Sequence, residues 1–79
     1  MTATNGKWIP DIDNLTCWNE DNCIEVVFER RGNTFVGKLN DMPDNLMDAW
    51  ASDPNGSSYI RQAVTEAEEA FLQAYAKRA

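Results

Sequence analysis

The stretch IEVVFERRGNTFVGKL, residues 24–39, constrains the fold of this chain more than any other part of its sequence. Apolar residues recur at every second position on both sides of a central Gly32-Asn33 pair, and such alternation is typical of β-strands that are buried on one face. Gly and Asn both tolerate the positive φ angles that two-residue hairpin turns demand. The stretch therefore predicts a β-hairpin with strands at 23–31 and 34–39.

The apolar pattern also predicts the register of this hairpin. A two-residue turn places Val26 opposite Leu39 and Phe28 opposite Gly37, which brings the apolar side chains of both strands to one face. A three-residue turn would mix the two faces, because a slip of one residue turns every side chain over. Gly37 opposite Phe28 then leaves room for the aromatic ring, or marks the close approach of a helix.

The segment TCWNEDNCI holds the only two cysteines of the chain, Cys17 and Cys23. A four-residue loop over 19–22 adds a short strand near 15–18 to the hairpin and puts Leu15 and Cys17 on the core face. A five-residue loop would place the two cysteines opposite each other and permit a disulfide, but it would turn Leu15 outward. We therefore expect two free thiols, with Cys17 buried as a small apolar residue and Cys23 more exposed.

Two helices are expected after the hairpin, at about 42–52 and about 58–77. The first begins with an acidic turn, for which Asp41 is the expected N-cap, and Pro54 prevents its continuation. The second is rich in strong helix formers and carries an apolar stripe at helical spacing. Strands followed by helices predict an α+β domain, a three-stranded antiparallel sheet with both helices packed on one face.

Composition and charge exclude several kinds of partner. The chain of 79 residues is expected to form a single domain, with residues 1–7 disordered. Its 13 acidic and 7 basic residues give a net charge of −6, and the scattered cations predict no nucleic-acid binding. No apolar run suits a membrane span or a secretory signal, so we expect a cytoplasmic protein with reduced cysteines and no membrane partner.

Few residues of the chain could carry chemistry. It contains no histidine, which removes the commonest general base and most zinc and haem sites. The C-x5-C spacing stands alone, whereas a structural zinc site needs four ligands. We therefore predict no catalytic, metal-binding or cofactor-binding residue and no enzymatic activity. A small enzyme that uses a carboxylate or a thiolate is the third-ranked alternative.

The acidic residues of the helices suggest a different function. Glu66, Glu68 and Glu69 form a charged cluster, which is usually no more than a solvated face but is alternatively a docking face for a basic partner. If Asp44, Asp48, Glu66 and Glu69 formed one contiguous surface, the chain would resemble an acidic inhibitor or nucleic-acid mimic that occupies a basic site on another protein. This is the second-ranked function.

The first-ranked function is a non-catalytic protein–protein interaction or regulatory module, with self-association as one form. Trp8 and Trp18 flank an irregular arm, and tryptophan is frequent at interface hot spots. Thr34, Val36 and Lys38 lie on a strand without a predicted neighbour, and an uncovered edge invites pairing with another chain. Alternatively, Lys38 guards this edge or the N-terminal arm covers it. These five residues are the predicted partner-binding residues.

Overall fold

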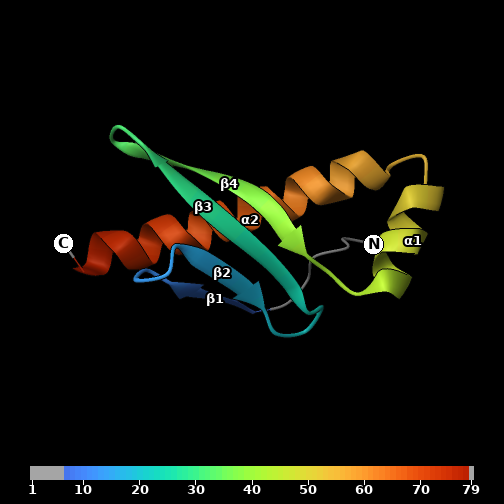
Figure 1. Cartoon of the computed structure of the whole chain (residues 1–79), viewed down its shortest axis with the longest axis horizontal. Helices are drawn as coiled ribbons and strands as arrows, with labels where there is room; N and C mark the ends of the chain where they lie inside the picture. Colours follow the sequence, from blue (N-terminus) through green and yellow to red (C-terminus); the bar gives the residue numbers. More distant parts are fainter. Residues whose placement is uncertain (1–6, 79) are drawn as a thin grey trace.

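The computed structural model describes residues 7–78. One antiparallel sheet of four strands is followed by two helices, which confirms the α+β class but adds a strand to the three expected (Figure 1). The elements are β1 (Trp8–Asp11), β2 (Thr16–Asn19), β3 (Ile24–Arg31), β4 (Thr34–Asp41), α1 (Asp44–Ser52) and α2 (Gly56–Arg78). The disorder expected for residues 1–7 falls outside the described range, except at Lys7, whose backbone N–H donates to Asp21 Oδ2 at 2.9 Å.

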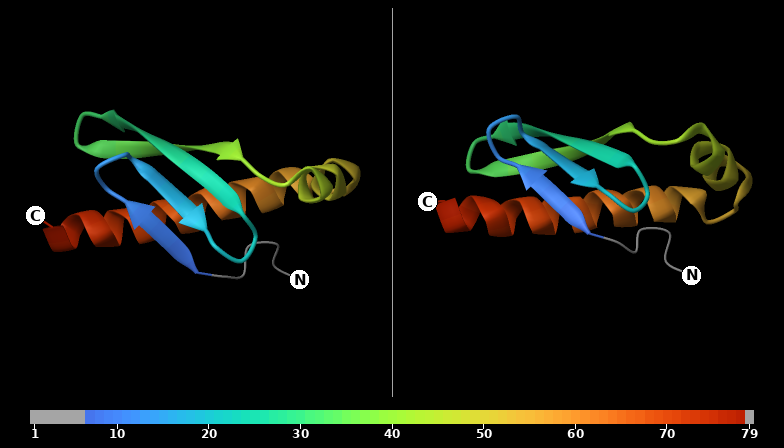
Figure 2. Two further views of the ribbon diagram at one scale, coloured as in Figure 1. Left: turned by 60° about the horizontal axis from the view of Figure 1, so that its bottom comes forward. Right: turned by 90° about the horizontal axis from the view of Figure 1, so that it is seen from below.

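The additional strand is β1. It was not expected, because Pro10 is incompatible with a regular central strand. The strand order is β1-β2-β3-β4, so β1 lies at an edge of the sheet, where proline is tolerated because its missing N–H leaves no neighbour unpaired. Pro10 stands opposite Cys17 in the antiparallel β1–β2 pair. Within the described residues, the N-terminal arm therefore occupies the edge opposite β4 and does not cover the edge of β4 (Figure 2).

The β3–β4 hairpin has the predicted register. Arg31 stands opposite Thr34, Phe28 opposite Gly37 and Val26 opposite Leu39. Gly32 takes a φ of 63°, as expected for the first central residue of a type II′ turn. Beyond Val26 the register shifts by one residue at an irregularity, and the strand runs on to Asp41 instead of ending at 39. Asp41 is therefore not the N-cap of the first helix.

The β2–β3 connection differs from the prediction by one position. Its loop covers 20–23, so Cys17 stands opposite Val26, whereas a loop over 19–22 would pair it with Ile24. The cause is Asn19, which is fully buried and whose Oδ1 accepts the backbone N–H groups of Asp21 at 3.1 Å and Asn22 at 2.9 Å. The Asn19 side chain thus organises the loop from the last position of β2.

The core lies between one face of the sheet and α2. The Phe71 ring, fully buried, stacks on Phe28 with ring centroids 4.3 Å apart and meets the edge of Phe35 at 5.1 Å. At Gly37 a Cβ atom would come within 2.9 Å of the Phe28 ring and 3.2 Å of Val64 on α2. Both explanations offered for Gly37, room for the ring and close approach of a helix, therefore hold.

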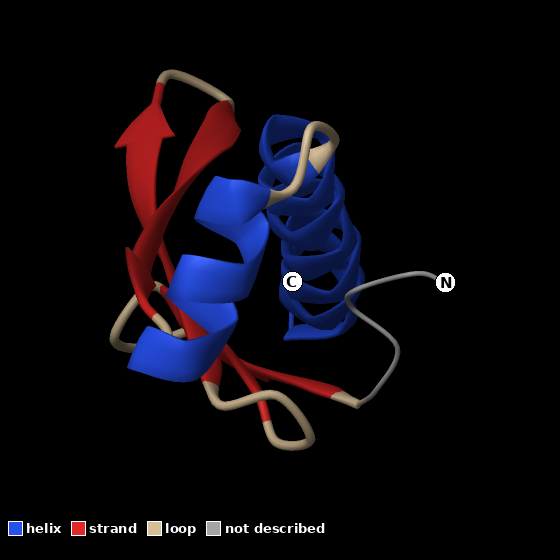
Figure 3. Cartoon of the chain, turned by 90° about the vertical axis from the view of Figure 1, so that its right-hand side faces the viewer, coloured by secondary structure: helices blue, strands red, loops and turns tan. Residues whose placement is uncertain are grey.

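Only α2 packs on the sheet, which corrects the expectation for the first helix. In the views of Figures 1 and 3, α1 lies beyond the end of the sheet, and it packs against the first turns of α2. Trp50 of α1 is buried, and its ring centroid lies 5.9 Å from that of Tyr59. Gly56 begins α2 two residues earlier than expected and lies against the Trp50 carbonyl, where no Cβ atom would fit.

Candidate functional site

The sheet has one face covered by α2 and one face that no described element covers (Figures 1 and 2). Period-two alternation assigns each strand residue to one of these faces. We call the uncovered side the open face. Its side chains come from all four strands: Ile9, Asp11, Thr16, Trp18, Glu25, Val27, Glu29, Arg31, Thr34, Val36, Lys38 and Asn40.

Four apolar residues form a diagonal line across the open face, which we call the apolar stripe: Ile9, Trp18, Val27 and Val36. Ile9 stands directly opposite Trp18, and Val27 and Val36 continue the line as diagonal neighbours on β3 and β4. Ile9 is 41% exposed, Trp18 38% and Val36 45%. Single exposed apolar residues are ordinary on protein surfaces, but a line that crosses a whole sheet is not.

Charged residues flank the β3–β4 part of the stripe. A shallow hollow of about 310 Å³ lies over the hairpin, lined on the open face by Val27, Glu29, Arg31, Val36 and Lys38. Arg31 Nη2 donates to Glu29 Oε2 at 3.3 Å, and both side chains are well exposed, so this ion pair adds little stability. The open face therefore combines an apolar stripe with charged residues beside it, and protein interfaces likewise combine apolar and polar surface.

The structure brings four of the five predicted partner-binding residues to the open face. Trp18, Thr34, Val36 and Lys38 all point to this side of the sheet. Trp8 does not, because its indole packs towards α2, where Nε1 donates to Glu66 Oε1 at 3.2 Å. This contact fits the competing explanation for Trp8, namely packing of the arm onto the rest of the fold.

Two members of the stripe, Ile9 and Val27, were not among the predicted residues. Ile9 belongs to β1, which was not predicted because of Pro10, so the face to which the Ile9 side chain points could not be assigned. Val27 interrupts the alternation of the hairpin by placing an apolar residue at an outward position, as Val36 does on the next strand. That interruption is the signal from which Val27 could have been found.

The edge of β4 presents unpaired backbone groups. A two-residue hairpin makes Arg31 and Thr34 a hydrogen-bonded pair, so the N–H and C=O groups of Phe35, Gly37 and Leu39 point away from β3. No other backbone group within residues 7–78 bonds to them. The edge next to Val36 can therefore accept another strand.

The acidic residues of α2 do not share one surface. Glu66 accepts from Trp8 and also from Gln62 Nε2 at 3.1 Å, which places it on the side of α2 that meets β1. Glu68 lies next to Gly37 of β4, and Glu69 is exposed. Asp44 and Asp48 lie on the other helix, so the carboxylates of the predicted acidic surface are distributed over separate parts of the molecule.

The two thiols are free, as predicted. Cys17 is fully buried and Cys23 is exposed. Burial raises the pKa of the Cys17 thiol to about 11, which makes it a poor nucleophile at neutral pH. Cys23 has a φ of 57°, so it occupies a loop position that favours glycine or asparagine.

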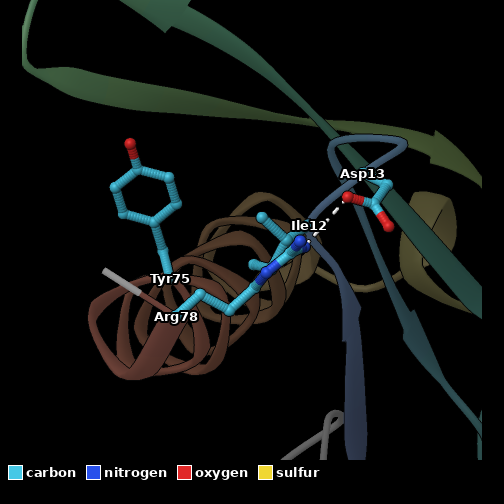
Figure 4. A pocket seen from close by; sticks show the side chains of 4 residues that line it. All are labelled: Ile12, Asp13, Tyr75 and Arg78. Carbon is cyan, nitrogen blue, oxygen red and sulfur yellow. Dashed lines mark hydrogen bonds and ion pairs between the residues drawn. The ribbon is translucent and has the colours of Figure 1, made fainter.

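A further hollow, near the C-terminal end of α2, is lined by Ile12, Asp13, Tyr75 and Arg78 (Figure 4). Arg78 Nη1 donates to Asp13 Oδ1 at 2.9 Å, and both side chains are largely exposed. The pair links the β1–β2 connection to the last turn of α2. Because the guanidinium already faces a carboxylate, the hollow offers no free cation to an anionic ligand.

Residues 7–78 contain neither a metal-binding cluster nor a helix suited to span a membrane. No three His, Cys, Asp or Glu side chains there are grouped so that they could hold a metal ion. None of the helices in that range has the length and apolar character needed to cross a membrane.

The chain was also compared with known proteins. No family model, no curated protein and no solved structure matches it.

Proposed function

We propose that this chain is a non-catalytic protein-interaction module that binds through the open face of its sheet and the adjacent edge of β4. The observation that carries the proposal is the apolar stripe, which crosses the open face and ends at Val36 on the edge strand. An apolar surface beside an unpaired strand edge is the arrangement used in recognition by strand addition.

In this mode, a strand of the partner bonds to the outward backbone groups of Phe35, Gly37 and Leu39. These main-chain bonds supply affinity, and alternate side chains of the added strand supply specificity. Those side chains would lie over Val36 and beside Thr34 and Lys38. A partner surface that reaches further across the sheet would cover Trp18, as a large aromatic anchor.

A second copy of the chain is the partner we propose first. Antiparallel pairing of two β4 strands about Gly37 would set Val36 of each copy beside Lys38 of the other, so no like charges stand directly opposite. Such pairing gives the same surface on both copies, as a two-fold symmetric dimer requires. The apolar stripes of the two copies would then join across the new sheet.

Sedimentation of the wild type and two variants tests this function. We expect a dimer at micromolar concentration, its loss in Val36→Lys, and its retention in Leu72→Lys. Leu72 is a matched control because it is 43% exposed on α2, against 45% for Val36 on β4. If the wild type is a monomer, a partner captured from cell extract by the wild type and Leu72→Lys, but not by Val36→Lys, supports the module. A strict monomer without such a partner contradicts it.

A further inference from the structure

A third hollow, lined mostly by apolar side chains, lies between α1, the start of α2 and the end of β4. It has a volume of about 450 Å³, and we call it the α1 groove. The apolar side chains that line it include Leu39, Met42, Met47, Trp50, Pro54 and Ile60. It is separate from the open face, because the residues that line it come from the helices and the end of β4.

The α1 groove is apolar at its mouth as well as at its base. Met42 and Trp50 are buried and form the base, while Met47 is 47% exposed and Ile60 36% exposed. Methionine side chains adapt to different partners because they are unbranched and polarizable, and they are frequent at binding surfaces for this reason. The groove could therefore accommodate an apolar side chain of a partner.

Acidic residues outnumber basic ones around the groove, where Lys38 and Arg61 are the cations nearest in sequence to the residues that line it. Residues 39–60 contain four aspartates and no lysine or arginine: Asp41, Asp44, Asp48 and Asp53. Asp53 lines the groove, and Asp41 precedes Met42. Residues three apart in a helix lie about 60° from each other around its axis. Asp44 and Asp48 are therefore close, around the axis of α1, to Met47 and Ala51, which line the groove. No ion pair with a lysine or arginine within residues 7–78 involves any of the four.

We propose that the α1 groove binds a basic amphipathic helix of a partner protein. An apolar side chain of that helix would fill the groove, and lysine or arginine residues around it would face the four aspartates. Charge complementarity selects this occupant over a second copy. A second copy is a poorer match for this groove, because the seven cations of the chain are scattered over its sequence, and Arg31 and Arg78 already pair with Glu29 and Asp13.

The probe for this site is a fluorescein-labelled 14-residue peptide with Leu and Lys at amphipathic helical spacing. Two comparison peptides replace every Lys with Glu or every Leu with Ser. We expect the Leu/Lys peptide to bind with a micromolar dissociation constant by fluorescence anisotropy, more weakly at higher salt, and both comparison peptides to bind at least about tenfold more weakly. The ε-methyl NMR signals of Met42 and Met47 should shift on binding.

Matched variants locate the binding. Asp44→Asn/Asp48→Asn should weaken the Leu/Lys peptide about threefold to tenfold, whereas Glu20→Gln/Glu69→Gln, with the same change in net charge, should change it less than about twofold. Met47→Gln should weaken binding about fivefold, and Leu72→Gln should leave it unchanged. Val36→Lys should retain most of the binding, which separates this site from the open face. Thermal unfolding verifies that each variant is folded.

Three results would overturn the proposal. Equal losses in the two carboxylate variants, or an equally strong complex with the Leu-free peptide, would show attraction by net charge alone. Binding unaffected by Met47→Gln and without methyl shifts would place the peptide elsewhere. A dimer that Met47→Gln disrupts would identify a second copy as the occupant.

Discussion

The two faces of the sheet are formed by the same four strands, but one face packs on α2 and the other is exposed to solvent. On the covered face, Phe28 and Phe35 meet Phe71 of α2, and little of any of these rings reaches solvent. On the open face, Trp18 is 38% exposed and Val36 45% exposed, and no described element lies above them. The comparison teaches that apolar residues at strand positions need not mark the core, and that the face they occupy decides their role.

The difference between the two faces is visible in the sequence, at the positions where the alternation of apolar and polar residues is interrupted. Strict alternation would place polar residues at all outward positions of the hairpin, as Glu25, Glu29 and Lys38 are. Val27 and Val36 depart from it. Neither residue belongs to the core formed with α2, and the proposed partner surface accounts for their apolar character.

The largest expected effect on stability comes from a substitution in the core beneath the covered face. Phe71→Ala removes the ring on which Phe28 and Phe35 pack, and replacement of a fully buried phenylalanine costs about 3–5 kcal/mol. A domain of this size has a total stability of about that order, so the variant should be largely unfolded at 37 °C. Urea unfolding followed by circular dichroism measures the effect. Leu72→Ala is the control, and a similar loss there would contradict the assignment of the core.

The next effect concerns the approach of α2 to β4. Gly37→Ala introduces a Cβ atom in contact with Phe28, Val64 and Glu68, and such overpacking costs about 1–3 kcal/mol. The neighbouring Lys38→Ala should change the free energy of unfolding by less than about 0.5 kcal/mol. A Gly37→Ala variant as stable as the wild type would mean that the helix does not approach the strand so closely.

A smaller effect is expected at the β2–β3 loop. Asn19→Ala removes the acceptor for the backbone N–H groups of Asp21 and Asn22, which should cost about 1–2 kcal/mol. The loss should appear in denaturant unfolding. It should also increase the hydrogen exchange of these two amides. Unchanged exchange would show that the loop keeps its form without the Asn19 side chain.

The two thiols should differ in reactivity, because Cys17 is buried and Cys23 is exposed. A thiol reagent at neutral pH should modify Cys23 within the time that leaves Cys17 intact. Because the pKa of Cys17 rises from 9.0 to about 11 on folding, its contribution to stability is complete below pH 9 and is lost as the pH rises towards 11. Cys17→Ala should therefore show a smaller decline in unfolding free energy over this range. Faster modification of Cys17 than of Cys23 would contradict the structure.

The smallest effect on stability belongs to the open face. Trp18→Ala should change the free energy of unfolding by less than about 1 kcal/mol, since 38% of the residue is exposed and it lies on the face of the sheet opposite to α2. The same variant should weaken association severalfold by sedimentation. A large loss of stability with unchanged association would assign Trp18 to the fold and not to binding.

Local pattern predicted the hairpin register, the turn and the role of Gly37, because period-two alternation and turn chemistry act within a few residues. It missed β1, since Pro10 excludes a central strand but not an edge strand, and edge position is a property of the whole sheet. It placed the β2–β3 loop one residue too early, because the loop was chosen to bring Leu15 and Cys17 to the core face, whereas the buried Asn19 side chain organises the loop. The place of α1 depends on the contact of Trp50 with α2, which no local pattern specifies.

The open face was partly predictable for the same reason. Thr34, Val36 and Lys38 follow from the hairpin register, and Trp18 from its strand. Trp8 was expected to join them as a partner-binding residue, but its orientation depends on a hydrogen bond to Glu66, which is 58 residues away in the sequence. Contacts of this kind appear only in the folded chain.

Amide hydrogen exchange along β4 tests the central claim most directly. In dilute protein, the outward N–H groups of Phe35, Gly37 and Leu39 should exchange rapidly, whereas those of Val36 and Lys38, bonded to β3, should be protected. Under conditions of association, the first three should become protected and the exposed face of α2 should not change. If they stay unprotected while the protein is associated, the edge of β4 is not the binding surface.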